Sequence, residues 1–302
     1  MFFIKENKIG LAKELRRMFP KEEFVRLENR GNSRIFSSDE RIIKYLPEKY
    51  LKPYFDIYDL LKGRTNIGLP EILDVKKSEV LESYIVVMKK NRGDLLADVW
   101  KDFSMEEQGL ILKKMMLLLK KINSVSLNPK DVPKSLIFFS RDLSWNREVK
   151  EFCLTKLDEY EKNGFIKKSL HNSFLLILNE NIDYIASIDY VLSHRDFHFN
   201  NLLIDKNFNL TLLFDFETFG IGDKYLDLVI AGSFLREKYQ KMFFDLYGRP
   251  KNFEEISKVY RLIMSISFFK KVDIKEEKEV IEFIEKGFPF FNFELKKNHE
   301  KN

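Results

Sequence analysis

A carboxylate and an amide stand five positions apart in the segment 194–201, which reads HRDFHFNN. Asp196 is a residue that can orient a hydroxyl group and accept its proton while the oxygen attacks. Asn201 offers an amide oxygen, a hard ligand that suits a divalent cation such as Mg²⁺. Because an alcohol is a poor nucleophile, attack by its oxygen needs both positioning and electrostatic stabilisation. The pair therefore predicts a site where a hydroxyl group attacks a metal-bound electrophile.

A second carboxylate follows at the end of an expected hairpin. Two short strands are predicted on either side of the polar turn 205–209, and Asp215 directly follows the second strand. We expect Asp215 to be a further ligand of the same cation. With the pair above, it matches the order of the kinase catalytic loop H-R-D-x-x-x-x-N and the later D-F-G aspartate, with Glu217 in place of the glycine. Two such motifs in order are more specific than either alone.

The whole segment 192–228 resembles the aminoglycoside phosphotransferase and choline kinase-like family, whose pattern reads approximately H-G-D-x-H-x-x-N, D-[WF]-E, G-D and D-L. The matching residues are His194, Asp196, His198, Asn201, Asp215-Phe216-Glu217, Gly222-Asp223 and Asp227-Leu228. The chain departs from the pattern at Arg195, Phe199 and Asn200, where the family has glycine, proline and glycine. None of these departures removes a catalytic group. A looser resemblance extends from about Phe24 to Leu228.

The resemblance also implies a turn that covers the phosphates of a nucleotide. Gly31, Asn32 and Ser33 begin the motif GNSRIF, which resembles the family's G-x-S-x-x-[YF]. A glycine lets the backbone approach phosphate oxygens, and the serine can point its hydroxyl and amide at them. A plain hairpin turn explains the same residues equally well.

Further nucleotide contacts are implied at a lysine and a hinge. Lys44 would hold the α- and β-phosphates, and backbone groups between Met88 and Asn91 would contact the nucleobase. An acidic partner of Lys44 is expected on the next helix, where Glu48 and Asp56 are both open as candidates.

Three other sets of residues invite a choice between function and structure. His194 and His198 have the spacing of a zinc helix, but they lie in a loop context without an evident third ligand, so we interpret them as loop-shaping residues. Asp223 and Asp227 are interpreted as structural: they would cap a helix beginning near Lys224 and tie down the catalytic loop. The aromatic segment 288–293 could form a cation–π cage, but core packing is favoured because the chain contains 29 phenylalanines.

The remaining pattern predicts strands first and helices later. Short strands are expected between 24 and 45, around 72–73 and over 84–88, with a helix over about 50–62 between them. Ser104 and Glu107 form a capping-box pattern ahead of a helix with one apolar face. Further helices are expected over about 143–160 and 253–269.

Composition sets broad limits on the function. The 302 residues include 52 basic and 47 acidic ones, for a formal net charge of +5. The two signs alternate along the chain without a basic stripe, so we expect no nucleic-acid partner. The chain becomes charged at Lys5, and no apolar stretch is long enough to span a bilayer, so we expect neither a signal peptide nor a membrane span. Cys153 is the single cysteine, and we expect a cytoplasmic protein.

These observations predict an α+β, bilobal protein-kinase-like fold with a small antiparallel β-sheet lobe and a larger, mainly helical lobe. Residues 1–92 would form the nucleotide-binding lobe including the hinge. Residues 93–302 would form the helical lobe with the catalytic loop and the acceptor site.

The function that the resemblance implies is transfer of the γ-phosphate of ATP or GTP to a hydroxyl group of a small molecule, with Mg²⁺ as cofactor. Asp196 would be catalytic, and Asn201 and Asp215 would bind the metal. The acceptor is open among an aminoglycoside-type antibiotic, a choline-like amino alcohol, and a sugar or vitamin alcohol. A protein kinase is less favoured, because the chain has no A-P-E motif. A non-catalytic nucleotide-binding module is the alternative from another class, and the oligomeric state is open.

Overall fold

The computed structural model divides the chain into two compact units. The described residues are 8–27, 34–62, 68–125, 144–186, 190–268 and 277–287. Unit 1 comprises Met1–Asp94 and Leu203–Glu217, and unit 2 comprises Leu95–Leu202 and Thr218–Asn302. The segment Leu203–Glu217, which is expected in the helical lobe, therefore groups with the first unit.

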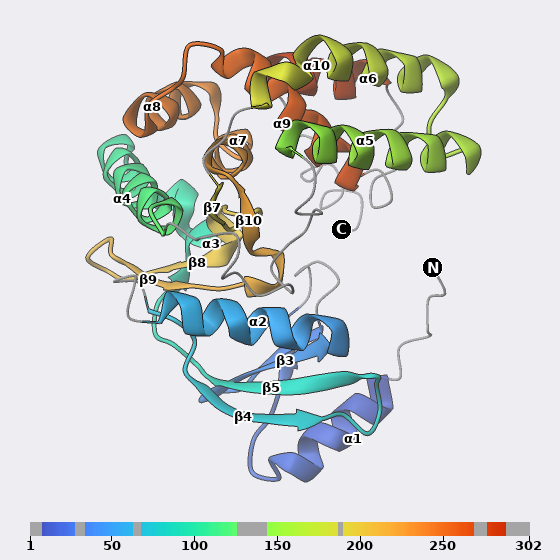
Figure 1. The fold of residues 1–302 in the computed structure, drawn as a ribbon. Helices are drawn as coiled ribbons and strands as arrows, with labels where there is room; N and C mark the ends of the chain where they lie inside the picture. Colours follow the sequence, from blue (N-terminus) through green and yellow to red (C-terminus); the bar gives the residue numbers. More distant parts are fainter. Residues whose placement is uncertain are drawn as a thin grey trace. The chain divides into compact units, whose positions relative to one another are not determined.

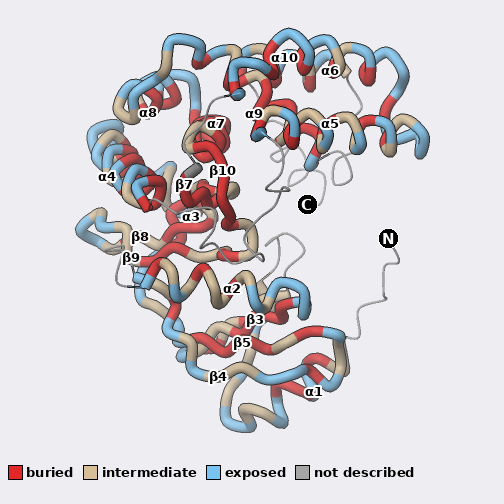
Figure 2. Tube along the Cα trace, in the orientation of Figure 1, coloured by how far each residue is buried: buried red, intermediate tan, exposed pale blue. Residues whose placement is uncertain are grey.

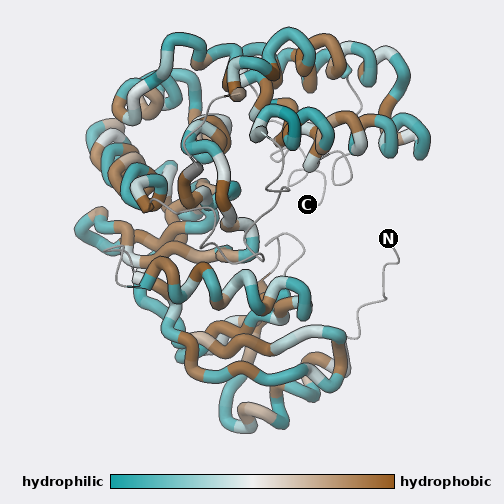
Figure 3. Tube along the Cα trace, viewed as in Figure 1, coloured by the Kyte–Doolittle hydropathy of each residue, from teal (hydrophilic) through white to brown (hydrophobic). Residues whose placement is uncertain are grey.

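Unit 1 contains a five-stranded antiparallel sheet in the order β1-β2-β3-β5-β4 (Figure 1). Its strands are β1 (Val25–Arg26), β2 (Arg34–Ser37), β3 (Arg41–Pro47), β4 (Ile72–Lys77) and β5 (Ser83–Lys89). The central strands β3 and β5 are rich in β-branched residues, which favour extended backbone, and Figure 3 shows hydrophobic residues along both. The expected strands are thus confirmed, and β4 and β5 extend beyond the predicted bounds.

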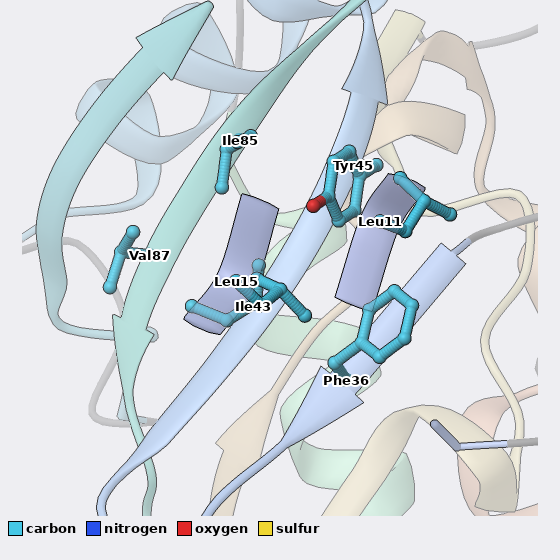
Figure 4. Close-up of a cluster of buried hydrophobic side chains, with 7 residues drawn as sticks. All are labelled: Leu11, Leu15, Phe36, Ile43, Tyr45, Ile85 and Val87. Carbon is cyan, nitrogen blue, oxygen red and sulfur yellow. The ribbon is translucent and has the colours of Figure 1, made fainter. Parts of the chain in front are cut away.

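The described part of this unit also contains two helices, α1 (Lys8–Met18) and α2 (Glu48–Leu61). Leu11 and Leu15 lie one turn apart on α1 and pack with side chains of β2, β3 and β5 (Figure 4). The buried cluster consists of Leu11, Leu15, Phe36, Ile43, Tyr45, Ile85 and Val87. The sequence predicts the bounds of α2 to within a few residues, whereas α1 is not among the predicted helices.

The predicted hairpin of β8 (Leu202–Ile204) and β9 (Leu210–Leu213) is confirmed, with β6 (Asp94–Leu95) as a third strand in the order β6-β8-β9. Gly68 forms a parallel bridge with Leu212, and the amide of Leu213 donates to the Gly68 carbonyl at 3.3 Å. This backbone pairing explains why the hairpin groups with unit 1. It also brings Asp215, which follows β9, into that unit.

Unit 2 is mainly helical, as expected. Its α-helices are α3 (Leu96–Val99), α4 (Met105–Asn123), α5 (Trp145–Lys162), α6 (Lys168–Asn181), α7 (Lys224–Ser233), α8 (Glu237–Tyr247), α9 (Phe253–Phe268) and α10 (Glu277–Lys286). The capping box of α4 is confirmed: the Glu107 amide donates to Ser104 Oγ at 3.3 Å, and the Ser104 amide donates to Glu107 Oε2 at 2.7 Å. The helices predicted from about 143 and 253 correspond to α5 and α9.

The core of unit 2 centres on α7, whose residues 226–233 are all buried (Figure 2). A helix buried on every side must be covered by its neighbours, and α7 packs against α8, α9 and β7 (Tyr190–Ser193). The antiparallel pair of β7 and β10 (Gly220–Asp223) leads from the catalytic loop into this helix. Among the helices in the described ranges, none is both long and apolar enough to cross a membrane.

Candidate active site

The catalytic-loop residues lie between β7 and the short 3-10 turn η4 (Phe199–Asn201) in unit 2. Asn201 Nδ2 donates to Asp196 Oδ2 at 3.1 Å and to the Asp196 carbonyl at 2.8 Å. His198 Nε2 lies 3.1 Å from Asp196 Oδ1. The Asp196 side chain is 30% exposed, so its carboxylate is oriented on two sides and is still accessible to a substrate. The structure therefore brings Asp196 and Asn201 together.

Asp227 fixes the start of this loop from the buried helix α7. Its carboxylate accepts hydrogen bonds from the amides of His194 at 2.8 Å and Arg195 at 2.6 Å, and from Asn123 Nδ2 at 3.3 Å. Burial raises the pKa of this carboxyl group, while His194 and the two amides act in the opposite direction. The amide of Asp196 in turn donates to His194 Nδ1 at 3.3 Å. The predictions that Asp227 ties down the loop and that His194 shapes it are confirmed.

Asp223 is confirmed as the cap of α7. Its Oδ1 accepts from the amide of Tyr225 at 3.1 Å, as the N-cap residue of a helix does. Its Oδ2 accepts from the hydroxyl of Tyr260, whose oxygen accepts from Trp145 Nε1 at 3.0 Å. This buried chain of hydrogen bonds links α5, α9 and the start of α7.

Arg195 occupies a position where the family pattern has glycine, and the backbone conformation there explains why glycine is suited to it. Its φ of 64° lies in the left-handed region, which glycine adopts at little cost. The guanidinium group donates through Nη2 to the Ile221 carbonyl. Burial lowers the pKa of the guanidinium group to about 10, an effect that Asp227 opposes. Arg195 thus fills space beside β10 that a glycine would leave open.

In unit 1, a buried lysine lies between two carboxylates. Lys44 Nζ is 2.7 Å from Asp215 Oδ1 and 2.5 Å from Glu217 Oε1, and the lysine side chain is 6% exposed. Burial lowers the pKa of Lys44, but Asp215 and Glu217 outweigh that effect and the pKa is raised overall. The ammonium group is therefore held charged in a site with little solvent.

These contacts correct the expectation for the acidic partner of Lys44. Neither Glu48 nor Asp56 of α2 takes that role; Asp56 lies 2.8 Å from Lys52 on the same helix. The partners come instead from the segment that follows β9, because β3 and that segment meet within one unit. Glu217 belongs to the motif Asp215-Phe216-Glu217 but has no predicted role, and its position two residues after Asp215 is the signal that could have shown one.

Glu217 is the more deeply buried of the two carboxylates. Its side chain is 12% exposed, against 32% for Asp215. Burial raises the pKa of Glu217 to about 7, while Lys44 lowers it and Asp215 adds to the rise. Within the described ranges, Glu217 Oε2 has no hydrogen-bond partner. A buried carboxylate oxygen of this kind suits a cation or a polar ligand group.

Phe216, between the two carboxylates, packs against α2. Its ring centroid lies 5.5 Å from that of Tyr54 and 6.5 Å from that of Tyr58. The hydroxyl of Tyr54 contacts Met88 Sδ at 3.5 Å. This aromatic packing fixes the backbone on either side of Phe216. It therefore positions both carboxylates that hold Lys44.

The predicted nucleotide-contacting residues are placed only in part. Gly31, Asn32 and Ser33 lie outside the described residues. Met88 is buried near the end of β5, and Asn91 follows the strand with its Oδ1 buried and without a hydrogen-bond partner in the described part of the chain. The structure shows their positions, and their contacts with a nucleobase stay a prediction.

The residues present fit a magnesium ion. Carboxylate and amide oxygens are the ligands that Mg²⁺ prefers, and it commonly takes one or two carboxylates while phosphates and waters supply the rest. The ammonium group of Lys44 already provides a positive charge against Asp215 and Glu217. No cluster of three or more His, Cys, Asp or Glu side chains able to hold a metal occurs among the residues that the structure describes.

The chain is similar to known proteins of one family. A family model described as a phosphotransferase enzyme family matches residues 36–256. The GDP complex of aminoglycoside 2'-phosphotransferase-IIIa has a similar structure, with a TM-score of 0.70 and 14% identity over 93% of this chain and 98% of that one. ADP-bound aminoglycoside phosphotransferase APH(2'')-Ib matches with a TM-score of 0.65 and 13% identity over 93% and 98% of the two chains.

A third similar structure comes from Streptomyces rimosus. It is aminoglycoside phosphotransferase APH(3'')-Id in complex with ADP and streptomycin, with a TM-score of 0.60 and 14% identity over 86% of this chain and 98% of that one. The similarities show that the chain has the bilobal, kinase-like α+β fold that the sequence predicts.

Proposed function

Because the chain belongs to the phosphotransferase enzyme family, it is a small-molecule kinase, and we propose that it transfers the γ-phosphate of ATP or GTP to an alcohol. The observation that carries this proposal is the Asp196 carboxylate, which is oriented by His198 and Asn201 and is exposed enough to meet a substrate. An acceptor hydroxyl at this carboxylate would be aligned for attack, and its proton would pass to Asp196 as the new O–P bond forms and the bond to the leaving diphosphate breaks.

Asn201 and Asp215 are the residues that would hold magnesium. Asn201 donates from its amide nitrogen to Asp196, and its amide oxygen is the atom that can bind a cation. When bound, the cation supplies positive charge to the phosphate oxygens on which negative charge accumulates. Glu217, two residues from Asp215, would keep Lys44 charged and oriented in the same region of unit 1.

The nucleotide would be held by residues of unit 1. Lys44 would steady the inner phosphates, since its ammonium group is buried, charged and fixed by two carboxylates. Gly31, Asn32 and Ser33 would cover the phosphates, and the segment from Met88 to Asn91 would contact the base. Similar structures solved with GDP, ADP and ATP support a nucleotide donor and leave open the choice between ATP and GTP.

The acceptor is a small alcohol whose identity is open. Similar structures contain kanamycin and streptomycin, which supports testing aminoglycosides first. Choline, ethanolamine and sugar alcohols complete the panel. We also keep the proposal of a cytoplasmic location, which the single buried and unpaired cysteine Cys153 suits.

The proposal is tested by nucleoside diphosphate release from ATP or GTP, with magnesium, across this alcohol panel. At least one acceptor should stimulate release, and the product should carry the phosphate. Asp196→Asn should lower kcat about 100-fold or more, because the base is lost while the side-chain shape is kept. Its nucleotide affinity and thermal midpoint should stay close to those of Asp183→Asn, an exposed carboxylate in the same unit.

Two results would contradict this assignment. Full activity in Asp196→Asn would show that another group accepts the proton. Tight nucleotide binding without phosphorylation of any alcohol would favour the non-catalytic module.

A further inference from the structure

A small hollow in unit 2 lies between α8, the start of α4 and the 3-10 turn η1 (Trp100–Asp102). Its volume is about 130 Å³, and its lining residues are Trp100, Lys101, Gln108, Arg236 and Tyr239. Pockets for drug-sized ligands are typically several hundred Å³ or larger. This hollow can therefore enclose a single small group and not a whole aminoglycoside.

The walls of the hollow are fixed by hydrogen bonds and ring contacts. The buried Gln108 donates through Nε2 to the Trp100 carbonyl at 2.9 Å, and its Oε1 accepts from the Tyr239 hydroxyl. The rings of Trp100 and Tyr239 meet edge to face at 5.9 Å between centroids. A preformed site costs less to order when a ligand binds.

The charge of the hollow has one sign. Lys101 and Arg236 contribute two cations to the lining, and no acidic side chain is among the lining residues. A third cation is close, since Lys238 Nζ lies 4.5 Å from the centroid of the Tyr239 ring. The Arg236 side chain makes no capping hydrogen bond at the N-terminus of α8, although Glu237 stands in the first turn. Uncapped amides at a helix start add to the positive potential.

The hollow is also connected to the catalytic loop. Trp100 lies 4.5 Å from Phe199 between ring centroids, and Phe199 belongs to the loop that contains Asp196. The Trp100 indole is therefore both a wall of the hollow and a contact of the catalytic loop within the same unit.

We propose that this hollow, the η1–α8 pocket, binds a phosphate group. Arg236 would donate from its planar fork to two oxygens, and Lys101 would supply a point charge to a third. The bound group is either free inorganic phosphate or the phosphate end of a small metabolite. The proposal concerns binding in unit 2 and does not depend on which alcohol the enzyme phosphorylates.

The test uses the intrinsic fluorescence of the full-length protein. Of its two tryptophans, Trp100 lines the pocket, whereas Trp145 is buried and hydrogen-bonded to Tyr260. Inorganic phosphate and glycerol phosphate are titrated in separate arms at constant ionic strength set with KCl. We expect a saturable change in emission in at least one arm, and the arm with the tighter binding identifies free phosphate or a phosphate monoester.

The double variant Lys101→Gln with Arg236→Gln should weaken this binding at least tenfold, because it removes both charge-assisted donors. The matched control is Lys77→Gln with Lys113→Gln, which removes the same charge from exposed positions outside the pocket and should bind like the wild type. Equal affinity in the two double variants would overturn the proposal, because phosphate would then bind elsewhere, for example at the nucleotide site. Absence of a saturable signal in the wild type in both arms would also overturn it.

Discussion

At the scale of single residues, Arg195 and Gly220 form a pair that can be tested. A Cβ built on Gly220 would lie 2.6 Å from Arg195 Cζ, and the guanidinium group is buried there. Gly220→Ala should therefore lower the free energy of unfolding by about 1–3 kcal/mol, as overpacking does. Urea denaturation of the purified variants measures it.

The cause is isolated by repeating Gly220→Ala in an Arg195→Gly background. Removing the guanidinium group leaves room for the new methyl group, and glycine suits the φ of 64° at position 195. We expect the alanine to cost about 1 kcal/mol less in that background. An identical cost in both backgrounds would show that the close approach to Arg195 is not what excludes a side chain at Gly220.

The residue scale also shows what the sequence can predict about the site. Asp196, Asn201 and His194 interact within a few positions of one another, so a short motif contains their geometry. The contact of Lys44 with Asp215 joins residues 171 positions apart. No local sequence pattern identifies which acidic residue pairs with a given lysine. The partner was therefore expected on the neighbouring helix α2, and that expectation was wrong.

At the scale of secondary-structure elements, α1 is attached to the sheet by a buried carboxylate as well as by its apolar face. Glu14, 4% exposed, accepts from the Tyr45 hydroxyl at 3.0 Å, Ser78 Oγ at 2.9 Å and the amide of Glu79 at 2.7 Å. Glu14→Ala should lower the free energy of unfolding by about 3 kcal/mol, because it leaves these donors without an acceptor.

The neighbouring substitution Lys13→Ala is the control, since Lys13 is exposed on the same helix and should change stability by less than about 0.5 kcal/mol. Urea denaturation followed by circular dichroism measures both variants. Similar small effects of the two substitutions would mean that α1 contributes little to the stability of unit 1.

Some helices can be predicted from the sequence more readily than others. α4 begins with a capping box and repeats apolar residues at helical spacing, and its start is predicted correctly. In α1 the decisive residue is Glu14, whose burial depends on donors from Tyr45 and Ser78 that are distant in sequence. A polar residue on the buried face interrupts the apolar pattern, so periodicity alone does not reveal this helix.

At the scale of the whole molecule, the chain crosses between the two units more often than a single boundary allows. The hairpin β8–β9 separates the catalytic loop of unit 2 from Asp215, which belongs to unit 1. Sequence order places the hairpin after the loop and so suggests one continuous second lobe. The backbone pairing of Gly68 with strand β9 instead groups the hairpin with unit 1. Pairing between segments that are far apart in the chain leaves no local pattern in the sequence.

The single cysteine offers a measurement of how unit 2 opens. Cys153 lies on α5 with no exposed surface, and burial raises the pKa of its thiol to about 12. Only an exposed thiolate reacts with a disulfide reagent such as DTNB. At pH 8 the native protein should therefore release almost no chromophore at first, whereas the urea-unfolded chain should release one equivalent. Cys153→Ser should release none in either state.

The same burial sets a pH dependence of stability. The native state keeps the thiol proton up to about pH 12, while the unfolded chain loses it near the ordinary value of about 9. The native state thus binds more protons in this window, and the free energy of unfolding should fall as the pH rises through it. Cys153→Ala should not show this part of the loss, which urea titrations of both proteins at pH 8 and pH 10 can measure. Rapid labelling of the native wild type at pH 8, or equal losses in the two proteins, would show that Cys153 is not buried in solution as α5 places it.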